Sequence, residues 1–147
     1  MFAMTAAPLV SAGAAALDGK QVQIAGKVFN FLEKKPAAGA TVVIVSGAAD
    51  PAAVKTTLAS LKIVEGGAGD AAGAFAAFVG SAADAQAAKA ANAAIITIGG
   101  DVACVDSGAC VIAIETQPKV SIYVSRAAAT KAGVEFDTSF KMLVTER

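Results

Sequence analysis

The two cysteines of the chain are the residues with the clearest potential for chemistry. Cys104 and Cys110 stand six positions apart, and Ser107 and Gly108 between them can turn the chain. This spacing favours a disulfide that closes a small loop, which would imply an oxidising compartment. The alternative is a pair of free thiols buried as small hydrophobic side chains. A metal site is not expected, because the chain has no histidine and no second cysteine pair.

A second group of polar residues follows the ends of β-forming runs. Ser46 and Ser81 stand at two such ends, with Gly47 and Gly80 beside them, and Asp101 follows a third. Open α/β sheets bind ligands at the carboxyl ends of their parallel strands, so Ser46, Ser81 and Asp101 are candidates for lining a polar cleft. Both serines also suit turns and helix caps, which is the simpler interpretation.

Catalysis is not expected from these residues. A nucleophilic serine needs a general base, and without histidine that base has to be a lysine. No Ser-x-x-Lys motif is present. Asp101, Asp106 and Glu115 could in principle bind a hard cation, but their spacing matches no calcium loop. We therefore expect a protein that is not an enzyme and that has no cofactor.

Alternating strand and helix patterns are expected to position these residues. An apolar stripe predicts a helix from Lys20 to the residues before Pro36. The β-branched run from Thr41 to Val45 is typical of a strand buried on both faces. Asp50 and Ser81 are predicted to cap two further helices, the second of them at 82–91. Further strands are predicted at 62–65, as an edge strand, and at 74–79 and 94–98.

A hairpin is predicted to complete the sheet. Runs 110–115 and 120–124 favour strands, and a turn containing Pro118 separates them. A short helix from about Arg126 to Lys131 follows. The predicted fold class is α/β: a mixed, mainly parallel sheet flanked by helices on both faces, with a C-terminal antiparallel hairpin and a terminal helix.

Composition points to one folded domain. The chain has 147 residues, of which 56% are hydrophobic and 16% charged, and this excludes a disordered chain. Lys and Arg number 12, as do Asp and Glu, so there is no electrostatic footprint for nucleic acid or for an anionic membrane. No apolar run approaches the ~20 residues that a membrane span needs. Residues 1–19 are interpreted as an apolar leader or a signal-peptide remnant, and residues 20–147 as the single domain.

The bulky apolar residues are mostly expected in the core. They include Phe136, Phe140, Met142 and Leu143 of the tail. Phe31 lies off the main helical stripe, so it is either a further core residue or a surface anchor for a partner.

Short motifs along most of the chain resemble the YfiR-like family of small periplasmic proteins. The family's first helix has the form "lYNFakFveWP", to which 28–36 is similar, and its β-rich "vicvlGddP" segment is similar to 41–51. The family's C-terminal motifs resemble 107–114, 120–125, 128–134 and 137–143. Two positions depart from the pattern: Ser125 replaces the usual Asn, and Lys35 replaces the aromatic residue before the proline.

The resemblance implies a non-enzymatic regulator in the periplasm. The best-studied family member restrains an inner-membrane diguanylate cyclase by binding its periplasmic sensor portion, and so controls cyclic di-GMP. For this chain the resemblance implies a homodimer that contacts such a membrane protein without inserting into the membrane. Phe31, Tyr123 and Ser125 are the partner-binding candidates. A short-loop disulfide near the hairpin belongs to the same picture, so a bridge between Cys104 and Cys110 would make the contact redox-sensitive.

Two other functions stay open. One is a small-molecule binding module that uses the cleft at Ser46, Ser81 and Asp101. The other is a structural or assembly subunit whose apolar N-terminal leader packs against a neighbouring chain.

Overall fold

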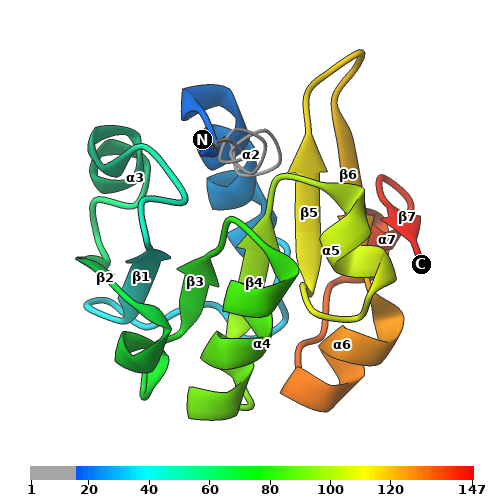
Figure 1. Ribbon diagram of the computed structural model, residues 1–147. Coiled ribbons are helices and arrows are strands. Elements are labelled where there is room, and N and C mark those ends of the chain that lie inside the picture. The colour runs from blue at the N-terminus through cyan, green and yellow to red at the C-terminus, as the bar shows by residue number, and fades with distance from the viewer. Residues whose placement is uncertain (1–15) are drawn as a thin grey trace, which may run out of the picture.

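The computed structural model describes residues 16–147, which form an α/β fold around one sheet (Figure 1). Most of the expected leader therefore lies outside the described residues. The strands are β1 (Thr41–Val45), β2 (Lys62–Gly66), β3 (Ala76–Phe78), β4 (Ile96–Gly99), β5 (Ile112–Glu115), β6 (Ser121–Val124) and β7 (Thr145–Glu146). The helices are α2 (Gly19–Phe29), α3 (Pro51–Thr57), the 3-10 helix η1 (Ala68–Ala71), α4 (Ala82–Ala91), α5 (Val102–Asp106), α6 (Arg126–Ala132) and α7 (Thr138–Lys141).

The sheet is mixed and mostly parallel, as predicted. Its seven strands have the order β2-β1-β3-β4-β5-β6-β7. The first five strands in this order run parallel to one another, and β5 and β6 form the antiparallel hairpin. The chain leaves β1 for β2 on one side and returns to β3 on the other side. The topological switch point is therefore between β1 and β3, and ligand clefts are expected near that edge.

Two cores cover the two faces of the sheet. Alternate residues of β1 point to opposite faces: Val42 and Ile44 enter one core, and Val43 and Val45 enter the other. The first core also holds residues from α2, α3 and α6, and the second holds residues from α4, α5 and η1. Figure 1 shows α4 and α5 on the near face of the sheet and α2 on the far face.

Helix α2 is fixed at its start by a capping box. The Asp18 carboxylate accepts from the Gln21 N–H, and the Gln21 side chain accepts from the Asp18 N–H, both at 2.9 Å. The helix ends at Phe29, earlier than predicted. Residues 31–33 instead pair with residues 135–137 in a short bridge, which satisfies their backbone groups outside a helix.

Several locally encoded elements match their predictions. Strand β1 has the predicted bounds, and β2 is an edge strand. Asp50 caps α3 by accepting from the Ala52 N–H, and Ser81 caps α4 by accepting from the Asp84 N–H. Each cap satisfies a helix N–H that would otherwise have no partner.

Four elements were not predicted. Helix α5 has five residues, which is too short to carry a periodic pattern. The 3-10 helix η1 lies in the glycine-rich segment between β2 and β3. The predicted helix after the hairpin is present as α6, and the apolar tail beyond it, where no element was predicted, forms the four-residue helix α7 and then β7 along β6. Backbone bonds hold this last strand: the Arg147 N–H donates to Val124 O at 2.8 Å, and the Arg126 N–H donates to Arg147 O at 3.2 Å.

Candidate functional site

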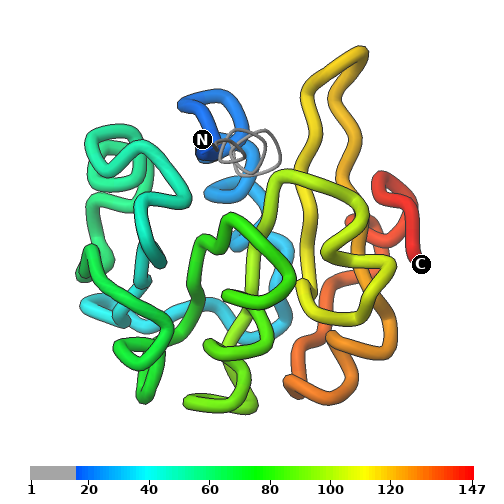
Figure 2. Tube along the Cα trace, in the orientation of Figure 1, coloured from blue at the N-terminus to red at the C-terminus, as the bar shows by residue number. Residues whose placement is uncertain are grey.

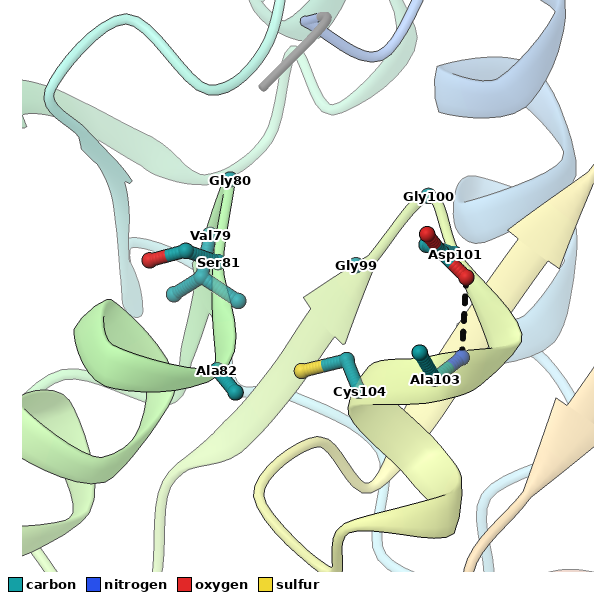
Figure 3. Close-up of a pocket in the computed structure, with 9 residues that line it drawn as sticks. All are labelled: Val79, Gly80, Ser81, Ala82, Gly99, Gly100, Asp101, Ala103 and Cys104. Carbon is teal, nitrogen blue, oxygen red and sulfur yellow. Dashed lines mark hydrogen bonds between the residues drawn. The ribbon is translucent and has the colours of Figure 1, made fainter. Parts of the chain in front are cut away.

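A cavity opens at the carboxyl ends of β3 and β4, one strand away from the switch point. It encloses about 200 Å³. Its walls are the loop that leads from β3 into α4 and the loop that leads from β4 into α5 (Figure 3). The lining residues are Val79, Gly80, Ser81, Ala82, Gly99, Gly100, Asp101, Ala103 and Cys104.

Helix caps determine how the two polar residues of this cavity lie. Ser81 is the N-cap of α4, and its hydroxyl accepts from the Asp84 N–H at 3.1 Å. Asp101 is the N-cap of α5, and its carboxylate accepts from the Ala103 N–H at 2.9 Å, the bond drawn in Figure 3. Both residues are exposed. The cavity is therefore bordered by one hydroxyl and one carboxylate, each already used as a cap.

Ser46 is not part of this cavity, so the predicted three-residue cleft is only partly assembled. Ser46 and Gly47 have φ angles of 51° and 72°, and these left-handed conformations turn the chain sharply after β1. The Ser46 N–H donates to Gly66 O at 2.8 Å, which holds this turn toward β2. The structure brings together Ser81 and Asp101, and it leaves Ser46 outside the cavity.

Leu17 lies between the β1 turn and the loop after β4. Its N–H donates to Ala48 O at 2.8 Å, and its carbonyl accepts from the Asp50 N–H at 3.2 Å. A Cβ placed at Gly100 would stand 3.6 Å from the Leu17 side chain. The buried side chain of Leu17 therefore lies against Gly100, which is one of the residues that line the cavity.

Cys104 and Cys110 form a disulfide, with their Cα atoms 5.1 Å apart. Of the two arrangements left open by the sequence, the structure contains the bridge. The loop between them is tied back to α5, because the N–H groups of Ala109 and Cys110 donate to Cys104 O at 3.1 and 3.0 Å. Buried Thr97 holds the same loop from β4: its hydroxyl donates to Ala109 O and accepts from the Val111 N–H.

The two cysteines differ in their surroundings. Cys104 lines the cavity, and Figure 3 shows its sulfur pointing into the space beside Ala82 and Gly99. Cys104 is 7% exposed, whereas Cys110 is fully buried at 0%. Of the two sulfur atoms of the disulfide, only that of Cys104 therefore borders the cavity.

The disulfide is compatible with an oxidising compartment. Among residues 16–147, no helix is long and apolar enough to cross a membrane. In the same part of the chain, no three His, Cys, Asp or Glu side chains gather as metal ligands do.

The three partner-binding candidates do not share one surface. Phe31 is half-buried and stacks on Phe140, with the ring centroids 5.2 Å apart, so it packs against the first core. Tyr123 packs against the second core, on the opposite face of the sheet. Ser125 is 3% exposed, and its hydroxyl accepts from the Ala128 N–H as the cap of α6. Its side chain therefore has no free surface to offer a partner.

Exposed apolar surface comes instead from residues that the sequence analysis placed in the core or at the start of a strand. The large exposed hydrophobic side chains of the described region are Val120, Met142 and Leu143, which are 46%, 82% and 67% exposed. Phe136 and Phe140 are buried as expected, but Met142 and Leu143 are not. Met142 is the C-cap of α7, and the Leu143 N–H donates to Phe140 O at 2.8 Å, so the chain turns out of the core there. A one-turn helix gives too short a pattern to reveal this.

A bidentate ion pair joins α5 to the C-terminal strand. The Arg147 guanidinium donates to both carboxylate oxygens of Asp106, at 2.7 and 2.9 Å. The Asp106 carboxylate raises the pKa of Arg147 above its ordinary value. The same guanidinium lies 5.9 Å from the centre of the Tyr123 ring. Both groups are exposed, so the pair orients the strand more than it stabilises the fold.

Comparison of the chain with protein-family models and with curated proteins finds no match. The fold class and the disulfide are established by the structure.

Proposed function

We propose that the chain is a non-enzymatic regulatory protein, exported to the periplasm, that binds the periplasmic portion of a membrane-bound diguanylate cyclase. The observation that supports contact with another protein is a group of exposed apolar residues beside the hairpin. We call Val120, Met142 and Leu143 the hairpin edge.

The strand register places the segment that holds Met142 and Leu143 beside the hairpin that holds Val120. Strands β6 and β7 run parallel, with Tyr123 beside Thr145. Residues just before β7 therefore lie next to the beginning of β6, where Val120 precedes the strand. In Figure 2 the hairpin extends beyond the rest of the sheet, with the C-terminal segment beside it. Large apolar side chains on a projecting element are typical of protein contact sites.

The backbone of β7 adds a second means of contact. Strand β7 is the last in the sheet order, so within residues 16–147 it has a strand neighbour on one side only. An edge strand presents N–H and C=O groups that can pair with a strand of another protein. The exposed Met142 and Leu143 just before β7 would then supply the apolar contacts of the same interface.

The cavity supports the small-molecule alternative less well. Ligand pockets typically enclose about 300–1,000 Å³. The cavity beside Ser81 and Asp101 encloses about 200 Å³, and both of those side chains serve as helix caps. The alternative of an assembly subunit depends on the leader at residues 1–19, of which residues 1–15 lie outside the described structure.

The test is binding of the purified chain to the periplasmic sensor portions of the membrane diguanylate cyclases of the same organism. We expect one sensor portion to bind saturably. Changing Met142→Ser and Leu143→Ser together should weaken that binding about tenfold or more, because buried apolar contacts dominate such interfaces. The matched control is Ala90→Ser with Ala91→Ser, a pair of exposed positions on α4.

The two parts of the proposal fail separately. Binding to none of the sensor portions would reject the cyclase partner. Binding that is equally tight in the Met142→Ser, Leu143→Ser variant and in the control would keep the partner and reject the hairpin edge.

A further inference from the structure

The two sulfur atoms of the disulfide differ in their access to solvent. The sulfur of Cys104 faces the cavity in Figure 3, and Cys104 is one of the lining residues. Cys110 is not among them and is fully buried. Any reagent that enters through this cavity therefore meets Cys104 first.

Strand β4 lies against both sulfurs, and more closely against that of Cys110, since a Cβ placed at Gly99 would stand 3.7 Å from Cys104 Sγ. A Cβ placed at Gly99 would stand only 3.0 Å from Cys110 Sγ, so this strand lies directly against that atom. Both neighbours of Cys110, Ala109 and Val111, are fully buried as well. Reaching Cys110 Sγ from solvent therefore requires local opening of the structure around it.

We propose that this cavity is an entry site for small thiols, which react with the disulfide at Cys104 Sγ and form a mixed disulfide there. In the reaction, the incoming thiolate forms a bond to Cys104 Sγ, and the bond between Cys104 and Cys110 breaks. The bonding electron pair leaves on Cys110 Sγ, which then takes up a proton. The small thiol is the only co-reactant, and its sulfur and Cys110 exchange oxidation states. This inference does not depend on the partner proposed above.

Charge at the cavity selects among small thiols. Asp101 is an exposed carboxylate on the cavity wall. Glu115 lies at the same helix end, where its carboxylate accepts from the Val102 N–H at 2.9 Å. Two negative charges repel an anionic thiol and attract a cationic one. The class of thiol that fits is therefore a small aminothiol.

The site of reaction can be tested with two single-cysteine variants. Cys110→Ser leaves the cavity cysteine, and Cys104→Ser leaves the buried one. Each is treated with cystamine, the disulfide of an aminothiol, and the mixed disulfide is followed by intact mass. We expect Cys110→Ser to react about tenfold faster or more, because the buried thiol reacts only after local opening. In guanidinium chloride the two rates should become equal. A native Cys104→Ser variant that reacts as fast as Cys110→Ser would overturn the proposal.

A second measurement uses the oxidised wild-type chain, because a single-cysteine variant can fail to fold. The protein is treated with cysteamine, quenched with acid, alkylated and fragmented in the mass spectrometer. The expected intermediate has cysteamine on Cys104 and the alkyl group on Cys110. The reverse distribution, or an even mixture of the two, contradicts attack through the cavity.

The charge preference has its own matched pair of variants. Asp101→Asn keeps an oxygen to cap α5 and removes the charge. Asp50→Asn does the same at the cap of α3, outside the cavity. In wild type, cysteamine should react faster than 2-mercaptoethanesulfonate by about threefold at low salt, after correction for thiol pKa. Asp101→Asn should lower this ratio, and Asp50→Asn should not. An unchanged ratio in Asp101→Asn contradicts electrostatic selection by this residue.

Discussion

At the scale of single residues, Gly99 shows how closely the sheet and the disulfide are packed. It ends β4, and a Cβ there would stand 3.0 Å from Cys110 Sγ and 3.6 Å from Cys104 Cβ. These contacts come from α5 and from the loop that precedes β5, so their effect at position 99 could not be predicted from the local sequence. What the sequence indicated there was only a glycine after a strand.

The Gly99→Ala variant tests this packing. The added methyl group must push the disulfide or the β4 backbone aside, so we expect a loss of about 1–3 kcal/mol in the free energy of unfolding. Urea denaturation measures it. The control is Gly69→Ala, where a Cβ meets nothing within 4 Å. Equal stability of the two variants would show that the contact at Gly99 is not tight.

Asp137 provides a pH-dependent contribution at the same scale. The hydroxyl of Ser139 donates to its carboxylate at 2.7 Å, and this bond, followed by the Phe140 N–H, lowers the pKa of Asp137. A lowered folded-state pKa gives stability that is present above the unfolded-state pKa and lost as pH falls through the folded-state pKa.

Ser139→Ala should therefore be less stable than wild type at pH 7, and the difference should shrink in acid as Asp137 becomes protonated. Urea denaturation at pH 7 and at about pH 3 measures the two differences. Because Asp137 is only partly buried and solvent screens its charge, a small effect is expected. Thr138→Ala, the neighbouring exposed position, is the control. A difference that stays constant with pH would contradict the assignment.

At the scale of elements, Gln21 connects helix α2 to the sheet. Its side-chain oxygen completes the capping box with Asp18, and its side-chain nitrogen donates to Ile114 O in β5 at 2.8 Å. One side chain thus caps a helix and satisfies a strand carbonyl 93 positions away.

Gln21→Ala removes both bonds. We expect it to lower the free energy of unfolding by about 1–2 kcal/mol, because a helix cap is lost and a partly buried carbonyl loses its donor. Gln23→Ala, at an exposed position of the same helix, should change stability little. Equal unfolding midpoints for the two variants would show that the bond to Ile114 contributes nothing.

Elements defined by local patterns were predictable, and those that depend on distant partners were not. The run Thr41–Val45 is strongly β-forming, and Ser81 with the alanine-rich segment after it defines α4, so both have the predicted bounds. The early end of α2 and the formation of β7 depend instead on pairing with residues 135–137 and with β6. No local propensity carries that information.

At the scale of the whole molecule, topology decides which candidate residues meet. Ser81 and Asp101 share a cavity because β3 and β4 are neighbours in the sheet. Ser46 follows β1, and a left-handed turn takes it toward β2. Phe31 and Tyr123 pack on opposite faces. The α/β class could be inferred from the alternation of strands and helices. The grouping of side chains required the strand order, which the sequence does not specify directly.

The hairpin edge is also a property of the whole molecule. Met142 and Leu143 are far from the hairpin in the sequence, and the pairing of β7 with β6 places the segment that holds them beside it. An interface there would combine apolar side chains with the open edge of β7. It lies outside the disulfide-lined cavity, so partner binding and thiol exchange can be measured independently.

Hydrogen–deuterium exchange of the chain, alone and with a binding cyclase sensor portion, tests the central proposal most directly. If the hairpin edge and β7 form the interface, the amides of residues 142–147 should become protected in the complex, while those of α4 stay unchanged. Protection confined to the loops around Ser81 and Asp101, or no change at residues 142–147, would contradict a regulatory contact through this edge.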